Sequence, residues 1–172
     1  MTRACTLAAV REFLTAEQWE RLLAINPHLR PEAAKVRPVP SRAEWLASHV
    51  EASAHRDGPR VTLVAKGLRL DLTPNARLHP QVIARRRRAE HLVVERALAG
   101  IAPPAGPWRV CITRIGPRPM DDDNRTAAAK GTRDAIAMWL GVDDGDGSVA
   151  WEVRGEVARG YAVRVWIEGR DA

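Results

Sequence analysis

The sequence has few of the residues that build disulfide or zinc sites. Its two cysteines, Cys5 and Cys111, lie far apart and form no C-x-x-C pair. Its five histidines are scattered, without the H-E-x-x-H spacing of zinc hydrolases. These absences argue against a zinc knuckle and a disulfide framework, and they favour a reducing, cytoplasmic location.

Long apolar runs are also missing. No stretch approaches the roughly 20 apolar residues of a membrane-spanning helix. The start of the chain, MTRACTLAAVREF, has too short an apolar part for a secretory signal. The length of 172 residues and the apolar content of 45% therefore predict a soluble protein, in which one domain has a hydrophobic core and a smaller segment is attached to it.

Charge is distributed unevenly along this basic chain, whose net charge is +6. Residues 61–118 carry eleven basic and three acidic side chains, whereas residues 119–172 carry seven basic and eleven acidic ones. A positive middle followed by an acidic cluster suggests that one part holds a polyanion and the other reacts on it. Ordinary solvated surface charge is the alternative, and the charge count alone does not separate the two.

Two capping boxes predict helices in the first third of the chain. Thr15 with Gln18 opens one, and Ser41 with Glu44 opens the other. Between them, the spaced prolines of PEAAKVRPVP predict an extended linker. We therefore expect residues 1–58 to form a helical N-terminal extension with a proline-rich linker.

The remaining residues, 59–172, mix strand and helix patterns. VTLVAKGLRLDL alternates apolar and polar residues around Lys66-Gly67, which predicts two strands joined by a tight turn, and WRVCITRI predicts a central strand. The C-terminal SVAWEVRGEVARGYAVRVWIEG predicts a hairpin that turns near Arg159-Gly160.

Two helices complete this second domain. An apolar stripe predicts one from His79 to Ala99, and another runs from about Arg125 to Leu140, where Gly141 ends it. The expected fold class is α+β, a mixed β-sheet packed against helices with a short helical extension.

Two acidic clusters bracket the second of these helices. Asp121, Asp122 and Asp123 precede it with Asn124, and Asp143, Asp144 and Asp146 follow it. Crowded carboxylates repel each other unless a positive charge lies between them. The commonest such charge is a hard divalent cation, usually Mg²⁺ where phosphates are the substrate.

The spacing predicts how the acidic side chains are presented. Pro119 favours an extended backbone, in which Asp121 and Asp123 share one face and Asp122 points away. Asn124 is expected to cap the helix, and Gly141 turns the chain so that Asp143 and Asp144 approach from the other side. Such carboxylates can hold two metal ions roughly 4 Å apart.

Simpler interpretations remain open. Asp122 or Asp123 can serve only as a helix cap, and GVDDGDGS can be only a polar turn. A calcium loop starting at Asp144 is excluded, because Val149 and Gly155 occupy the positions that require Gly and a bidentate Glu.

The segment DDDNRTAAAKGTRDAIAMWLGVDD resembles the signature region of RusA-like Holliday junction resolvases, which are crossover-junction endodeoxyribonucleases common in phages and prophages. That family has a D-x-D-N start, a helix with Lys and Asp four residues apart, and an acidic pair after the helix. Upstream, TPNARLHPQVIARRRR is similar to the family's P-x-N loop with basic residues leading into a helix. The resemblance covers roughly residues 61–168.

This resemblance implies a Mg²⁺-dependent homodimer, with Mn²⁺ as a substitute, that nicks four-way DNA junctions in pairs. The essential metal ligands would be Asp121, Asp123 and Asp144, and Asp143 completes the candidate metal set. Lys130 would lie near the scissile phosphate.

A basic run supplies the first candidate DNA contacts. Arg85, Arg86, Arg87 and Arg88 follow one another on a helix, so they sweep most of its circumference and only two can face one ligand. Further candidates are Asn75, Arg77, Arg118 and Asn124. Solvated surface is again the alternative for the arginines, and a plain turn for the Pro-Asn pair.

These observations predict a structure-selective endonuclease that resolves Holliday junctions in DNA recombination and repair, with branched DNA as its partner and no membrane association. One alternative is a non-catalytic DNA-binding protein whose acidic residues only cap and turn. Another is a nuclease for flaps or other branched DNA.

Overall fold

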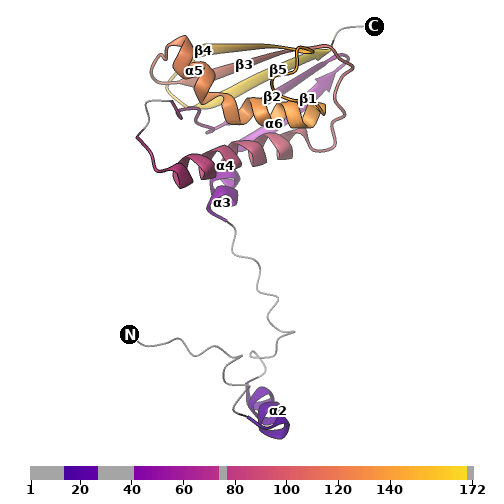
Figure 1. Cartoon of the computed structure of the whole chain (residues 1–172), viewed down its shortest axis with the longest axis vertical. Helices are drawn as coiled ribbons and strands as arrows, with labels where there is room; N and C mark the ends of the chain where they lie inside the picture. The colour runs from indigo at the N-terminus through magenta and orange to yellow at the C-terminus, as the bar shows by residue number, and fades with distance from the viewer. Residues whose placement is uncertain (1–13, 27–40, 74–76, 170–172) are drawn as a thin grey trace. The chain divides into compact units, whose positions relative to one another are not determined.

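The computed structural model describes residues 14–26, 41–73 and 77–169. The chain divides into two compact units, Met1–Val39 and Pro40–Ala172 (Figure 1). In the first unit, helix α2 (Ala16–Ile25) begins at the predicted capping box. The Gln18 N–H donates to Thr15 Oγ1 at 3.3 Å, and the Thr15 N–H donates to the Gln18 side chain at 3.0 Å.

The second unit is built on a five-stranded sheet in the order β1-β2-β5-β3-β4. The strands are β1 (Glu51–Asp57), β2 (Arg60–Lys66), β3 (Trp108–Gly116), β4 (Val149–Val157) and β5 (Ala162–Gly169). β3 and β4 are parallel, and the other neighbouring pairs are antiparallel.

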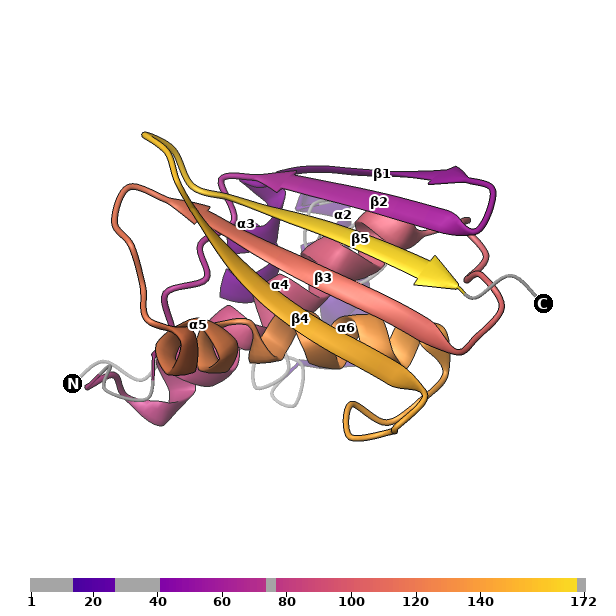
Figure 2. The ribbon, with the colours of Figure 1, turned by 90° about the horizontal axis from the view of Figure 1, so that it is seen from above.

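Four helices cover one face of this sheet (Figure 2). They are α3 (Arg42–Ser48), α4 (Pro80–Leu98), α5 (Asp122–Ala128) and α6 (Lys130–Leu140). The fold is therefore α+β, with a mixed sheet packed against helices, as the sequence predicts.

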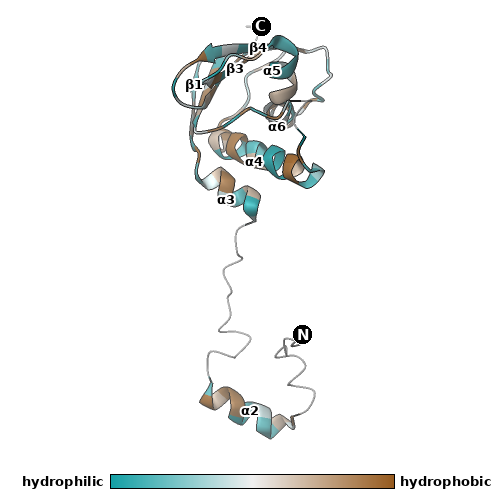
Figure 3. Ribbon diagram, turned by 90° about the vertical axis from the view of Figure 1, so that its left-hand side faces the viewer, coloured by the Kyte–Doolittle hydropathy of each residue, from teal (hydrophilic) through white to brown (hydrophobic). Residues whose placement is uncertain are grey.

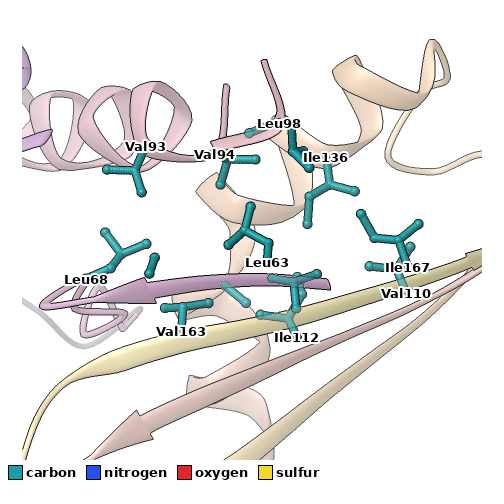
Figure 4. Packing of buried hydrophobic residues seen from close by; sticks show 14 of the residues in the cluster. Leu63, Leu68, Val93, Val94, Leu98, Val110, Ile112, Ile136, Val163 and Ile167 are labelled. Carbon is teal, nitrogen blue, oxygen red and sulfur yellow. The ribbon is translucent and has the colours of Figure 1, made fainter. Parts of the chain in front are cut away.

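The hydrophobic core lies between the sheet and the helices α4 and α6 (Figure 4). Alternate strand residues point into it, because successive side chains of a strand face opposite sides. Hydrophobic and hydrophilic residues succeed one another along α4, which buries one stripe and exposes another (Figure 3). The largest core side chains with almost no exposure include Leu63, Val94, Leu98, Ile112, Ile136, Val165 and Ile167.

The boundary between the two units follows Val39, whereas the sequence predicts it at residue 58. Helix α3 and strand β1 therefore belong to the second unit. Helix α3 starts at the predicted Ser41–Glu44 capping box and packs on α4. β1 pairs with β2 through the two-residue turn Gly58-Pro59, in which Gly58 has a φ of 55°. The sequence EASAHRD did not reveal this edge strand, because only Ala52 and Ala54 of it pack against the core.

Two further strand expectations are wrong. The segment after Gly67 forms no strand, since β2 already has β1 and β5 as neighbours. Leu68, Leu70 and Leu72 of that segment are buried instead. The C-terminal strands β4 and β5 form no hairpin, because β3 lies between them and pairs with both.

Helix α4 confirms the prediction over residues 79–99. His79 caps it by accepting the Gln81 N–H at 3.3 Å, and Pro80 occupies the first turn, where its missing N–H costs nothing. Within the described ranges, no helix combines the length and the apolar composition needed to cross a membrane.

Candidate functional site

The first acidic cluster forms the start of helix α5. Asp121 is the N-cap: its Oδ1 accepts the Asn124 N–H at 2.9 Å, and its Oδ2 accepts the Asn124 side-chain amide at 2.8 Å. The backbone N–H of Asn124 holds the pKa of Asp121 below its ordinary value. The expected cap at Asn124 is therefore wrong, and the helix begins three residues earlier.

This earlier start changes the geometry of the cluster. Asp122 and Asp123 lie in the first turn of α5, where the helix N-terminus favours negative charge, and not on an extended strand. Asp121 and Asp123 thus do not share an extended face as expected. Among the described residues, exposed Asp123 has no hydrogen bond or ion pair, whereas Asp122 pairs with Arg125.

Arg125 fixes this helix start on the edge of the sheet. Its Nη1 donates to the Met120 carbonyl at 3.1 Å, and its guanidinium lies against Gly155 of β4. A Cβ atom added at Gly155 would come within 2.7 Å of Arg125 Nη1. The glycine therefore makes room for the arginine that positions the acidic cluster.

The second acidic cluster follows α6, which ends at Gly141 in a left-handed conformation, with a φ of 76°, as predicted. The returning chain is fixed through the Asp144 carbonyl, which accepts from Trp151 Nε1 at 3.1 Å and from Arg133 Nη2 at 3.3 Å. Arg133 also lies over the Trp151 ring, 4.9 Å from its centre.

Two other aspartates of this loop act as turn residues. Asp143 Oδ1 accepts the Gly145 N–H at 3.0 Å, and Asp146 Oδ1 accepts the Ser148 N–H at 2.8 Å. The carboxylate of Asp144 makes no such backbone bond within the described residues. It points to a cation instead.

That cation is Lys130, at the first position of α6. Its Nζ donates to Asp134 Oδ1 at 3.0 Å and to Asp144 Oδ2 at 3.3 Å. The bond from Lys130 lowers the pKa of Asp144, and the two carboxylates together raise the pKa of Lys130. One positive charge thus bridges two carboxylates that come from different segments.

The bridge lies in an open depression of about 410 Å³, lined by Lys130, Asp134, Ala137, Met138, Val142, Asp143 and Asp144. Oxygen ligands of this kind suit a hard divalent cation. The ammonium group between Asp134 and Asp144 indicates that this pair can share one cation. Asp134 was not among the predicted site residues, although its i, i+4 spacing from Lys130 was visible in the sequence.

Lys130, Asp143 and Asp144 line the same depression, but among the described residues no hydrogen bond or ion pair joins any of them to the start of α5. Within residues 14–26, 41–73 and 77–169, no three His, Cys, Asp or Glu side chains form a ready metal-binding group. The complete set of Asp121, Asp123, Asp143 and Asp144 therefore stays a prediction.

The candidate DNA contacts differ in how free they are. Arg85 and Arg88 are exposed, whereas Arg86 pairs with Asp71 at 2.6 Å and Arg87 is half-buried beside α6. Arg85 and Arg88 are thus the two more exposed residues of the four, and their contact with DNA stays a prediction. Arg77 and Arg118 are exposed, and Asn75 lies outside the described residues.

The chain matches no protein-family model and no curated protein. Among solved structures it is similar to the OmpA-like domain of FopA1 from Francisella tularensis, with 12% sequence identity and a TM-score of 0.33. The match covers 72% of this chain and 84% of that one. A likeness this low carries no conclusion about fold family or function.

Proposed function

We propose that the protein is a Mg²⁺-dependent endonuclease that nicks branched DNA, with the Holliday junction as its substrate. The observation that carries the proposal is the Lys130 bridge between Asp134 and Asp144, in an open depression of a basic protein. The likeness of its acidic segments to RusA-like resolvases supports it. On the same ground we propose a homodimer, working in recombination and repair in the cytoplasm of a phage-infected or prophage-carrying host.

The side chains divide the work by their chemistry. Asp143 and Asp144 would hold the cation together with Asp123, whose carboxylate is exposed. When bound, Mg²⁺ would activate the attacking water and stabilise the leaving oxygen. Lys130 would then donate to a phosphate oxygen, and Arg85 and Arg88 would contact backbone phosphates.

A second candidate function is DNA binding without catalysis. The observation that favours it is that Asp121, Asp143 and Asp146 each accept a backbone N–H, as ordinary cap and turn residues do. Metal dependence separates the two candidates, because a binding protein needs no divalent cation to hold phosphates.

The test is incubation of the full chain with a labelled mobile four-way junction, a flap and a linear duplex, each with Mg²⁺, with Mn²⁺ and with EDTA. We expect paired nicks in the junction with either metal and none with EDTA. Cutting of the flap alone would assign the site to other branched DNA. Tight binding without cutting under every condition would establish the non-catalytic alternative.

Variants within one loop make the test specific. Asp144→Asn removes the charge that faces Lys130, and it should lower the cleavage rate by about a hundredfold or more while junction binding survives. Asp146→Asn is the matched control, since Asp146 turns toward Ser148 and should be replaceable with little effect. Equal rates for the two variants would contradict a catalytic role for Asp144.

A second pair tests the start of α5. Asp123→Asn should reduce cleavage strongly, because the exposed carboxylate is free to bind a cation, and Asp122→Asn should be mild, because Asp122 pairs with Arg125. If only Asp122→Asn is inactive, the assignment within this cluster is reversed.

A further inference from the structure

Glu90 is a buried carboxylic acid without a partner. It lies on α4, only 2% exposed, and neither of its carboxyl oxygens has a hydrogen-bond partner or contact with solvent within the described structure. A buried polar group in this state costs free energy, and an ionised one costs far more. Glu90 lies on the buried side of α4, one helical turn before Val93 and Val94.

The carboxyl group lies directly against the first turn of α6. A Cβ atom added at Gly131 would overlap Glu90 Oε2 and lie 3.1 Å from the carboxyl carbon. Glycine at this position therefore leaves room for the Glu90 carboxyl group, whereas the α4 backbone at Arg87 Cα would stay 3.5 Å from an added Cβ. Gly131 directly follows Lys130 in the first turn of α6, so the contact with Glu90 also helps to position the bridging lysine.

The neighbouring positive charges are too weak to keep the buried Glu90 carboxyl ionised. Burial is the main cause that raises the pKa of Glu90 to about 8, so its carboxyl is protonated at neutral pH. Arg86 and Arg87 on its own helix oppose that shift, and Asp71 and Asp134 from neighbouring segments add to it. Among the described residues, the ionisable groups that act on Glu90 or line the depression beside it are Arg86 and Arg87 of α4, Arg69 and Asp71 before α4, Asp134 of α6, and His49 at the end of α3, and Lys130 of α6 is the neighbour of Gly131.

We propose that Glu90 is a proton-controlled latch, which in its neutral form holds the first turn of α6 against α4 and on ionisation releases that turn together with Lys130. The latch is a property of the fold. Its effect on DNA cleavage rests on the proposed function.

The direction of the pH effect follows from proton linkage. Opening exposes Glu90 to water, where its pKa returns to the ordinary value of 4.5. Between pH 4.5 and about 8, opening therefore releases one proton, and the opening constant rises about tenfold per pH unit. Above pH 8 both states are ionised, and the constant levels off.

Amide hydrogen exchange of the full chain tests the predicted pH dependence of opening. The protection of amides in the first turn of α6 is measured and corrected for the intrinsic pH dependence of exchange. Protection in the wild-type protein should fall about fiftyfold between pH 6 and pH 8, nearly tenfold in the first unit and less as pH 8 is reached, and change by only about twofold above that. Glu90→Gln cannot ionise and should remove this dependence. Glu95→Gln, an exposed change on the same helix, should leave it intact.

Gly131→Ala provides a second, steric opening of the latch. The added methyl group should lower protection of the first turn by about tenfold or more already at pH 6, where Glu90 is neutral. Unchanged protection in Gly131→Ala, or a wild-type dependence that persists in Glu90→Gln, would overturn the proposal. So would amides of β3 and β5 that lose protection in step with α6, since that would be unfolding of the whole unit.

The cleavage assay is run separately on the same proteins from pH 6 to pH 9. A wild-type rate that falls with the loss of α6 protection, and a Glu90→Gln rate that does not, would support the link between latch and site. Opening of α6 without cleavage at any pH would refute the nuclease and leave the latch intact. Cleavage with pH-independent α6 protection would refute the latch alone.

Discussion

Arg114 allows a quantitative test of how the loop before α5 is held to the segment after β2. Its side chain lies on the helix-facing side of β3, and the residue is 6% exposed. Arg114 Nε donates to the Leu70 carbonyl at 3.0 Å, and Nη1 donates to the Arg118 carbonyl at 3.0 Å. No carboxylate of the described residues pairs with it. It therefore ties the segment after β2 to the loop before α5 through backbone contacts alone.

Arg114→Met keeps most of the volume and removes both bonds. A hydrogen bond to a charged group contributes about 1.5–3 kcal/mol, so two bonds set an upper limit of about 6 kcal/mol. Removing a buried cation recovers part of its desolvation cost, which offsets some of that loss. We expect the free energy of unfolding to fall by about 2–4 kcal/mol.

Equilibrium unfolding in urea, followed by tryptophan fluorescence, measures the change. Arg118→Met is the control, because the exposed side chain of Arg118 makes no bond of its own in the described structure, and it should shift the free energy by less than about 0.5 kcal/mol. A loss in Arg114→Met no larger than in the control would refute the reasoning that these two bonds hold the loops together.

Three further predictions follow from other contacts. The folded-state pKa of Glu90, about 8, exceeds its ordinary value of 4.5, so wild-type stability falls as the pH rises between these values, and Glu90→Gln should gain up to about 3 kcal/mol at pH 7 in urea titrations. Gly155→Ala should displace Arg125 and lower the free energy of unfolding by about 1–3 kcal/mol, with a smaller loss once Arg125 is also replaced by Ala. Lys130→Met should raise the pKa of Asp144 towards its ordinary value in a carboxyl NMR titration, and an unchanged pKa would contradict the bridge.

Local rules explain which parts of the fold were predictable. Caps depend on neighbouring residues only, so Thr15 and Ser41 correctly marked helix starts and Gly141 correctly marked a helix end. Strand pairing depends on distant residues, and there the prediction failed. The sequences of β4 and β5 do not indicate that β3 lies between them. The sequence of β1 is too polar to predict a strand, because β1 is an edge strand that pairs on one side only.

The same distinction applies to the candidate site. Lys130 and Asp134 are one helical turn apart, and Asp144 returns to them through a short loop, so their proximity was accessible to sequence reasoning. The position of Asp121 was not, because Asp and Asn are equally good caps and the sequence offers both within four residues. Glu90 was missed because its surroundings come from α6 and from the segment before α4, and no pattern within its own helix shows that it lacks a partner.

The place of β5 in the sheet bears on how the protein is made. β5 is the last strand of the sheet in the sequence, yet it lies between β2 and β3. On the ribosome, β1 and β2 can pair early and β3 and β4 later, but the two ribbons stay separate until residues up to Gly169 have left the exit tunnel. Until then each ribbon exposes the edge that β5 will cover, a template for pairing with other nascent chains. We expect this window to make the protein depend on chaperones during synthesis, and to make loss of β5 far more damaging than loss of β1.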